Sequence, residues 1–216
     1  MAENYQRILD DELGRVTENG HVPSLLLHSC CAPCSSYVLE YLSRYFTITV
    51  LYYNPNISPA EEFYLRAEEQ RRLINEMPQH HPISLIVGEY TPERFNEIAK
   101  GHEDDPEGGE RCFACYRLRL AQAARAAVEG GFDYFTTTLS ISPLKNAAKL
   151  NEIGKELSEQ YDIAYLYSDF KKKEGYKRSC QLSAEYGLYR QDYCGCIYSK
   201  RDAALRNNKK NSDNHA

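Results

Sequence analysis

Seven of the eight cysteines occur in three short groups, and their spacing indicates chemistry more strongly than any other feature of the chain. The groups are Cys30, Cys31 and Cys34; Cys112 and Cys115; and Cys194 and Cys196, while Cys180 stands alone. Adjacent thiols at the end of an apolar run are a poor choice for packing alone, because they are reactive. In a reducing compartment, clustered cysteines are more often metal ligands or redox catalysts than structural crosslinks. The spacing therefore predicts metal or redox chemistry.

The first two groups supply four thiolates whose spacing separates two kinds of metal site. Cys112 and Cys115 have the spacing of half a structural zinc site, in which four ligands surround one ion. Directly adjacent ligands such as Cys30 and Cys31 are unusual in a zinc site. An iron–sulfur cluster is larger, so neighbouring cysteines can each bind a different iron. The set favours a [4Fe–4S] cluster, and structural zinc is the alternative.

The third group, Cys194 and Cys196, is tighter than the usual redox pair, which has two intervening residues. Gly195 between them permits the sharp turn that a bridge would need. Such a small ring would be strained and easily reduced. We expect the pair either to cycle between dithiol and disulfide or to bind a second metal. Cys34 is expected either as a ligand of that second metal or as a buried helix residue.

Five apolar, β-rich runs alternate with helical patterns along the chain. The predicted strands are residues 24–29, 47–53, 83–87, 133–138 and 163–167. The predicted helices are residues 35–45, 58–77, 116–129 and 145–160, with a further helix from residue 91. This alternation predicts an α/β fold with a parallel five-stranded sheet flanked by helices. Ligands of such sheets bind beyond the carboxyl ends of the strands.

Reactive and polar residues follow four of the five predicted strands. They are Cys30 and Cys31 after the first, Asn54 and Asn56 after the second, Lys145 after the fourth and Asp169 after the fifth. From residue 170 onward there is no strand pattern, so an irregular segment is expected to fold over that edge of the sheet. Residues 1–206 are expected to form a single domain, followed by a disordered polar tail at residues 207–216.

Two other groups of polar residues are expected to be structural. His28 lies inside the first predicted strand and is expected to be a hydrogen-bonded core residue. Four glutamates between residues 61 and 69 are expected to form an exposed helix face. Arg66, Arg71 and Arg72 are expected to be their partners on that face.

Composition limits the classes of function. The chain has 216 residues, is 42% hydrophobic and carries a net charge of −5. No stretch approaches the roughly 20 apolar residues of a membrane span, and the first residues lack an apolar leader, so a cytoplasmic protein is expected. The negative charge disfavours general binding of polyanions. Residues 168–201, however, hold eight basic and four acidic residues with six aromatic residues, which suits either nucleic-acid binding or a solvated face.

Several segments, in the same order along residues 25–199, together resemble the QueH-type epoxyqueuosine reductases. They are LHSCCAPCS at 27–35, YNPNI at 53–57, CFACYR at 112–117, TTLSISP at 137–143 and YCGCIYS at 193–199, with DFKK at 169–172 and YKRS at 176–179. The resemblance implies reduction of epoxyqueuosine to queuosine at the wobble position of tRNAs for Asp, Asn, His and Tyr. The epoxide oxygen would leave as water, with electrons from an external donor, in the final step of queuosine synthesis.

The resemblance also implies a fold and a set of site residues. The fold would be similar to the adenine nucleotide alpha hydrolases. The glycine-rich phosphate loop of their ATP-using members is absent, and residues 30–34 occupy its place, which argues against use of ATP. The implied ligands of the [4Fe–4S] cluster are Cys30, Cys31, Cys112 and Cys115. Cys194 and Cys196 are implied as a redox-active disulfide or as ligands of a second, mononuclear iron, with Cys34 as a further candidate ligand.

Removal of an epoxide oxygen requires two electrons and two protons, whereas a single [4Fe–4S] centre normally passes one electron at a time. A dithiol or a second iron would complete the requirement. Asp169, Tyr193 and Lys145 are candidate proton donors. Substrate binding is expected from Asn54, Asn56, Lys145, Lys171, Lys172, Arg178 and Tyr193. The alternatives are an iron–sulfur electron carrier and an ATP-dependent tRNA thiolase on the same fold.

Overall fold

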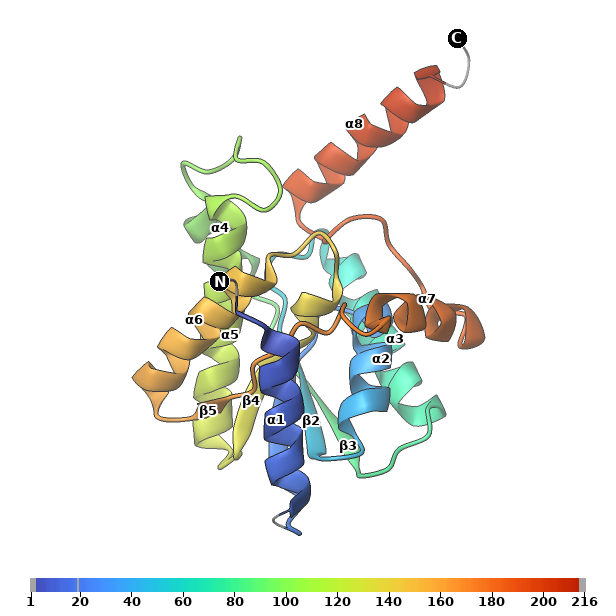
Figure 1. Ribbon diagram of the computed structural model, residues 1–216. Coiled ribbons are helices and arrows are strands. Elements are labelled where there is room, and N and C mark those ends of the chain that lie inside the picture. The colour runs from blue at the N-terminus through green and yellow to red at the C-terminus, as the bar shows by residue number, and fades with distance from the viewer. Residues whose placement is uncertain (1–2, 19, 214–216) are drawn as a thin grey trace.

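A five-stranded, all-parallel sheet forms the centre of the protein, as predicted (Figure 1). The structure, a computed structural model, describes residues 3–18 and 20–213, with side chains as far as residue 206. The strands are β1 (Ser24–His28), β2 (Thr47–Tyr52), β3 (Ile83–Val87), β4 (Tyr134–Thr137) and β5 (Ala164–Tyr165). Their order in the sheet is β3-β2-β1-β4-β5, so β1 is central.

Helices cover both faces of this sheet. They are α1 (Tyr5–Glu18), α2 (Ala32–Leu42), α3 (Ala60–Glu76), α4 (Pro92–Ala99), α5 (Glu110–Glu129), α6 (Ala147–Tyr161), α7 (Gly175–Glu185) and α8 (Ile197–Asp213), with a 3-10 turn η1 (Thr138–Ile141) after β4. Leu25 and Leu27 of β1 pack in a core with α1, α2 and α3, and Leu26 packs on the opposite face with α5 and α6. Burial on both faces explains why this strand is a continuous apolar run.

The amino-terminal helix α1 has no counterpart among the predicted helices. Its buried residues Leu9, Leu13 and Val16 are spaced four and three residues apart, which places them on one helical face. All three pack in the same core as Leu25 and Leu27. The helical spacing is therefore present in the sequence, although it spans only three apolar positions.

The carboxyl-terminal segment differs from the irregular structure and disordered tail that the sequence predicts. Two helices, α7 and α8, occur after residue 170, and Figure 1 shows α8 extending away from the body of the protein. The backbone of α8 continues to Asp213, so residues 207–213 are helical, while residues 214–216 lie outside the described part. No Gly or Pro interrupts α8, and a helix extends easily once its first turn has formed. The single domain over residues 1–206 stays a prediction.

The contact between α6 and β5 depends on a glycine. A Cβ atom at Gly154 would lie 2.3 Å from the ring of the buried Tyr165. We expect Gly154→Ala to lower the free energy of unfolding by about 1–3 kcal/mol, because it overfills the core. Gly14→Ala is the control, since Gly14 is exposed on α1 with nothing within 4 Å of the added atom. This control should raise stability by about 0.5–1 kcal/mol. Urea unfolding measures both, and equal stability of the two variants would contradict the prediction.

Candidate active site at the carboxyl edge of the sheet

Three thiols lie together immediately beyond β1. Cys30 and Cys31 occupy the turn between β1 and α2, and Cys34 lies in the first turn of α2, which begins with Ala32 and Pro33. The Sγ atoms of Cys30 and Cys31 are 3.7 Å apart, and all three Sγ atoms lie within 4.8 Å of one another. In the described part of the chain this is the one group of three such residues close enough to share a metal ion.

These three thiols are arranged to hold a negative charge. Hydrogen bonds from Cys31 and Cys34 hold the pKa of Cys30 well below its usual range, despite burial. The same contacts with Cys30 raise the pKa of Cys31, and those with Cys30 and Cys31 raise the pKa of Cys34. The group therefore favours a thiolate at Cys30 stabilised by two neighbouring thiols. A thiolate is the form of cysteine that binds metals and acts as a nucleophile.

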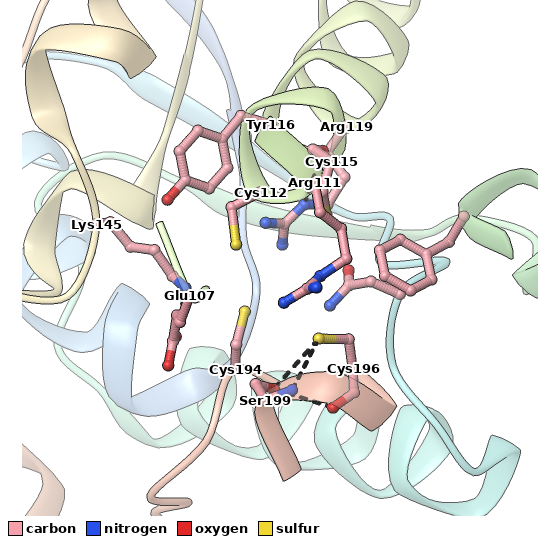
Figure 2. A pocket seen from close by; sticks show the side chains of 12 residues that line it. Glu107, Arg111, Cys112, Cys115, Tyr116, Arg119, Lys145, Cys194, Cys196 and Ser199 are labelled. Carbon is pink, nitrogen blue, oxygen red and sulfur yellow. Dashed lines mark hydrogen bonds and ion pairs between the residues drawn. The ribbon is translucent and has the colours of Figure 1, made fainter. Parts of the chain in front are cut away.

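Four further thiols surround a cavity of about 20 Å³, which is the smaller of two cavities at this site (Figure 2). Cys112 and Cys115 lie in the first turns of α5, which begins six residues before the predicted start at residue 116. Cys194 and Cys196 come from the segment between α7 and α8. Figure 2 shows the thiols of Cys112 and Cys194 pointing toward one another. Burial raises the pKa of Cys115 to about 12, so this thiol is protonated when no metal is bound.

Contacts with the β2–α3 region position Cys194 and Cys196. The backbone N–H of Ser58 donates to the carbonyl of Gly195 at 3.0 Å, and Nη1 of Arg66 donates to the carbonyl of Cys194 at 3.2 Å. Gly195 has a φ of +121°, and a Cβ atom there would lie 2.9 Å from Ile57. Only glycine adopts this backbone conformation without strain. The glycine between the two thiols is thus required by both its φ and the lack of space.

Buried cations lie close to the thiols. Arg66, Arg119 and Lys145 are each less than a tenth exposed. Burial alone would lower the pKa of Arg119, but electrostatic interactions with Cys115, Cys194 and Cys30, which grow as these thiols lose their protons, raise it. Burial likewise opposes the charge of Lys145, and interactions led by Cys194 raise its pKa well above the usual value. Both side chains therefore stay protonated and can balance negative charge on the surrounding sulfur atoms.

A larger cavity of about 570 Å³ adjoins the smaller one. Cys30, Cys31 and Cys34 lie in its wall, which also includes apolar residues after β4. Glu107, Lys145 and Cys194 line both cavities, so the two share a wall. A cavity of this size suits a small organic group. The site thus brings a substrate-sized space against thiols from three distant segments of the chain.

A family model described as "Epoxyqueuosine reductase QueH" matches residues 25–202, and this range holds all seven cysteines of the site. The chain belongs to the QueH family. Three relatives with the name "Epoxyqueuosine reductase QueH" illustrate the similarity. The protein of Staphylococcus epidermidis is 41% identical, and the match covers 99% of this chain and 91% of the relative. The protein of Streptococcus pyogenes is 42% identical over 92% of this chain and 78% of the relative. The protein of Thermotoga maritima is 34% identical over 82% of this chain and 90% of the relative.

Membership of the QueH family confirms the resemblance that the motifs predict, and the structure shows where their residues lie. Lys145 lines both cavities, Tyr193 lines the larger and Asn56 the smaller. Asn54 instead supports the site, because its amide donates to the carbonyl of Ser29 at 2.8 Å. Its Oδ1 accepts a hydrogen bond from Arg119 at 3.2 Å.

Four other predicted site residues of this QueH chain do not line either cavity. Asp169 forms an ion pair with Lys171, and it lines a surface hollow beside the start of α1 together with Lys172. Arg178 forms ion pairs with Glu40 and Glu185. The structure therefore brings Lys145 and Tyr193, but not Asp169, to the thiols as candidate proton donors.

Three buried arginines of the QueH site, Arg66, Arg111 and Arg119, have no place among the predicted site residues. Arg66 was expected on an exposed face of α3, but it is 2% exposed and lies under the ring of Tyr193, with its Cζ 5.2 Å from the ring centroid. Its ion pair with Glu62, at 2.7 Å, has the i,i+4 spacing that also occurs on solvated helices. Arg119 lies on α5, one turn after Cys115, and this spacing from a predicted ligand could have indicated it.

Among the described residues, no helix has the length and apolar character that crossing a membrane requires.

Proposed function

We propose that this protein reduces epoxyqueuosine to queuosine at the wobble position of tRNAs for Asp, Asn, His and Tyr, as the final step of queuosine synthesis in the cytoplasm. One observation carries the proposal. In a chain that matches the QueH family over residues 25–202, seven thiols from three distant segments gather around two adjoining cavities. The larger cavity can receive a modified base, because proteins that act on RNA loops splay their bases out of the stack.

The thiols fit an iron–sulfur centre by their chemistry. We assign the ligands of a [4Fe–4S] cluster to Cys30, Cys31, Cys112 and Cys115. Cys30, Cys31 and Cys112 pack in one cluster of side chains with Tyr116, and Arg119 interacts with both Cys30 and Cys115. Soft thiolates with buried cations beside them suit such a centre. When bound, it would supply electrons one at a time.

Cys194 and Cys196 are proposed as the two-electron partner. Two thiols can give two electrons and two protons: both bonds from carbon to the epoxide oxygen break, a carbon–carbon double bond forms, and water leaves. The two sulfurs become a disulfide, which the external donor reduces. All eight cysteines are free in the structure, and Cys194 borders both cavities.

Ligation of a second, mononuclear iron by Cys194 and Cys196 is the alternative role of the pair. Cys34 is a further candidate ligand, since it lines the larger cavity together with Cys194, although its Sγ also lies within 4.8 Å of those of Cys30 and Cys31. Iron analysis distinguishes the two roles. The dithiol requires no iron beyond that of the cluster, whereas the second site adds one iron per chain.

Lys145 is the proton donor that the geometry favours. Its ammonium lies in the wall shared by the two cavities and is 3.1 Å from Glu107. We expect Lys145→Met to lower the turnover number by about 10²–10⁴-fold, because the leaving oxygen loses the ammonium that passes it a proton and that regains this proton from the thiols. Iron content should not change. Asp169→Asn is the comparison, and it should retain most of the activity. The reverse pattern, with loss of turnover in Asp169→Asn alone, would exclude Lys145 as the donor.

The rim of the larger cavity is proposed to hold the RNA. Tyr176, Arg190 and Tyr193 line it, and the guanidinium of Arg190 lies 5.6 Å from the ring centroid of Tyr176. Aromatic and guanidinium planes of this kind can stack on an unpaired base. Lys172, in the hollow beside α1, is proposed to contact the phosphates. Lys171 and Arg178 already have carboxylate partners, so tRNA would have to displace these partners.

A conversion assay tests the proposed function. Anaerobically loaded protein, a strong reductant and tRNA containing epoxyqueuosine are incubated without ATP, and the nucleosides are separated by mass. The expected product is queuosine. If loaded protein leaves epoxyqueuosine unchanged under several reductants, the proposed function is wrong. Reduction of the protein without conversion of the nucleoside would indicate an electron carrier, and a requirement for ATP with incorporation of sulfur would indicate a thiolase.

A further inference from the structure

Unpartnered hydrogen-bonding atoms are concentrated around the smaller cavity. Eight buried side-chain atoms lack a hydrogen-bond partner in the described part of the chain, and one of these, Nη2 of Arg66, is instead ion-paired with Glu62. Five of them belong to residues that line this cavity: both amide atoms of Asn56, Nε of Arg111, the hydroxyl of Tyr116 and Nη2 of Arg119. Each of these side chains is at most 2% exposed. Native proteins rarely leave buried donors unpaired, so the concentration points to an acceptor that belongs in the cavity.

The surrounding contacts show which atoms are available to such an acceptor. Arg119 uses Nη1 on Asn54 and Nε on the carbonyl of Cys115, at 3.2 and 3.4 Å, which leaves Nη2 free. Figure 2 shows Tyr116 and Arg119 beside Cys112, on the cavity that Asn56 also lines. Two oxygen acceptors in the cavity wall already have partners, since Glu107 pairs with Lys145 and the hydroxyl of Ser199 bonds to the carbonyl of Cys196. The wall also carries the thiols of Cys112, Cys115, Cys194 and Cys196. Sulfur acceptors are therefore the chemistry that this cavity presents to the free donors.

We propose that Asn56, Tyr116 and Arg119 are positioning residues that donate hydrogen bonds to the sulfur atoms of the metal centre and thereby raise its reduction potential. The inference rests on the iron–sulfur centre of the proposed function. Hydrogen bonds to the sulfurs are one of the factors that set the potential of such a centre. They favour the reduced state because it carries more negative charge, and hydrogen bonds to charged acceptors are the stronger ones.

A trapped water molecule is the competing explanation. The cavity has room for about one water, which would satisfy the same donors without touching a sulfur atom. The two explanations differ in their effect on the potential. Loss of a donor to sulfur shifts the potential, whereas loss of a donor to water leaves it unchanged.

The test compares midpoint potentials of anaerobically loaded protein, measured by redox titration with spin resonance. Tyr116→Phe removes a single hydroxyl, and Asn56→Leu removes the amide at similar volume. Both variants should shift the potential downward while retaining iron and sulfide. Tyr134→Phe is the matched control, because the hydroxyl of Tyr134 lies outside the cavity and donates to Glu12 at 2.7 Å. The midpoint potential of this variant should equal that of the unmodified protein.

Three results would overturn the inference. One is an unchanged potential in both Tyr116→Phe and Asn56→Leu at full iron content. Another is an equal shift in Tyr134→Phe, which would indicate a general loss of stability. The third is the lack of a reducible centre in the unmodified protein, which would also overturn the proposed cofactor. Failure to convert tRNA, by contrast, would leave the measured potentials valid and would count only against the proposed function.

Discussion

Cys194→Ala and Cys196→Ala are each expected to lower turnover of epoxyqueuosine in tRNA by about 10³-fold or more, with the iron–sulfur centre retained. In the proposed reaction the pair supplies both electrons and both protons, and neither thiol alone can form the intramolecular disulfide that results. The two thiols line the smaller cavity with Cys112 and Cys115, and Cys194 also lines the larger one. Nucleoside analysis by mass measures turnover, and iron and sulfide analysis measures the centre.

Cys180→Ser is the matched control for these variants. Cys180 lies on α7 and lines neither cavity, so its substitution should leave both turnover and iron content near those of the unmodified protein. Full activity in both alanine variants would remove the pair from the mechanism. Loss of the whole centre would instead make Cys194 and Cys196 primary ligands, and the assignment to Cys30, Cys31, Cys112 and Cys115 would then be wrong.

Serine at any of the four proposed ligands is expected to remove most of the iron. The anaerobically prepared protein should hold about four iron and four sulfide per chain, and each variant should hold far less, because a hydroxyl replaces a thiolate ligand. The measurement is chemical iron and sulfide analysis together with the visible spectrum. Cys34→Ser adds information, since Cys34 lies within 4.8 Å of Cys30 and Cys31. We expect the Cys34→Ser variant to keep its iron.

Two outcomes would contradict this assignment of ligands. Stoichiometric zinc without acid-labile sulfide would establish the structural zinc site that the spacing of Cys112 and Cys115 also allows. Loss of iron in Cys34→Ser with retention in Cys112→Ser would instead locate the metal at the three thiols beyond β1.

The strands and most helices could be predicted because their apolar patterns are local. The central strand β1 is buried on both faces, so its sequence is an apolar run without the alternation of a strand that has one solvated face. His28 was likewise predicted correctly as a core residue, with Nδ1 2.9 Å from Thr137 Oγ1 and Nε2 3.1 Å from the carbonyl of Tyr53. Burial lowers the pKa of this histidine to about 3.

Long-range contacts account for what could not be predicted at the site. Glu62 and Arg66 have the i,i+4 spacing of an ordinary surface ion pair. Arg66 is nevertheless buried, because a segment 128 residues later in the chain packs against it. Arg66 donates a hydrogen bond to the carbonyl of Cys194 in that segment. Asp169 does follow a strand at the carboxyl edge, as its position suggested. That strand, β5, lies at the end of the sheet, with β4 between it and the central β1. Alternation of strands predicts which edge carries the site, but not how far along that edge each residue lies.

The distance in sequence between the thiols has a consequence for how the protein is made. A growing chain that has reached the end of β4 already contains Cys30, Cys31, Cys112 and Cys115, but neither Cys194 nor the backbone that Ser58 and Arg66 hold. The wall shared by the two cavities is incomplete until Cys194 has also been made. Domains fold largely as units, and contacts far apart in sequence form slowly. The candidate active site is therefore completed only after the segment with Cys194 and Cys196 has left the ribosome, and a product that terminates before this segment would carry uncovered thiols without this pair.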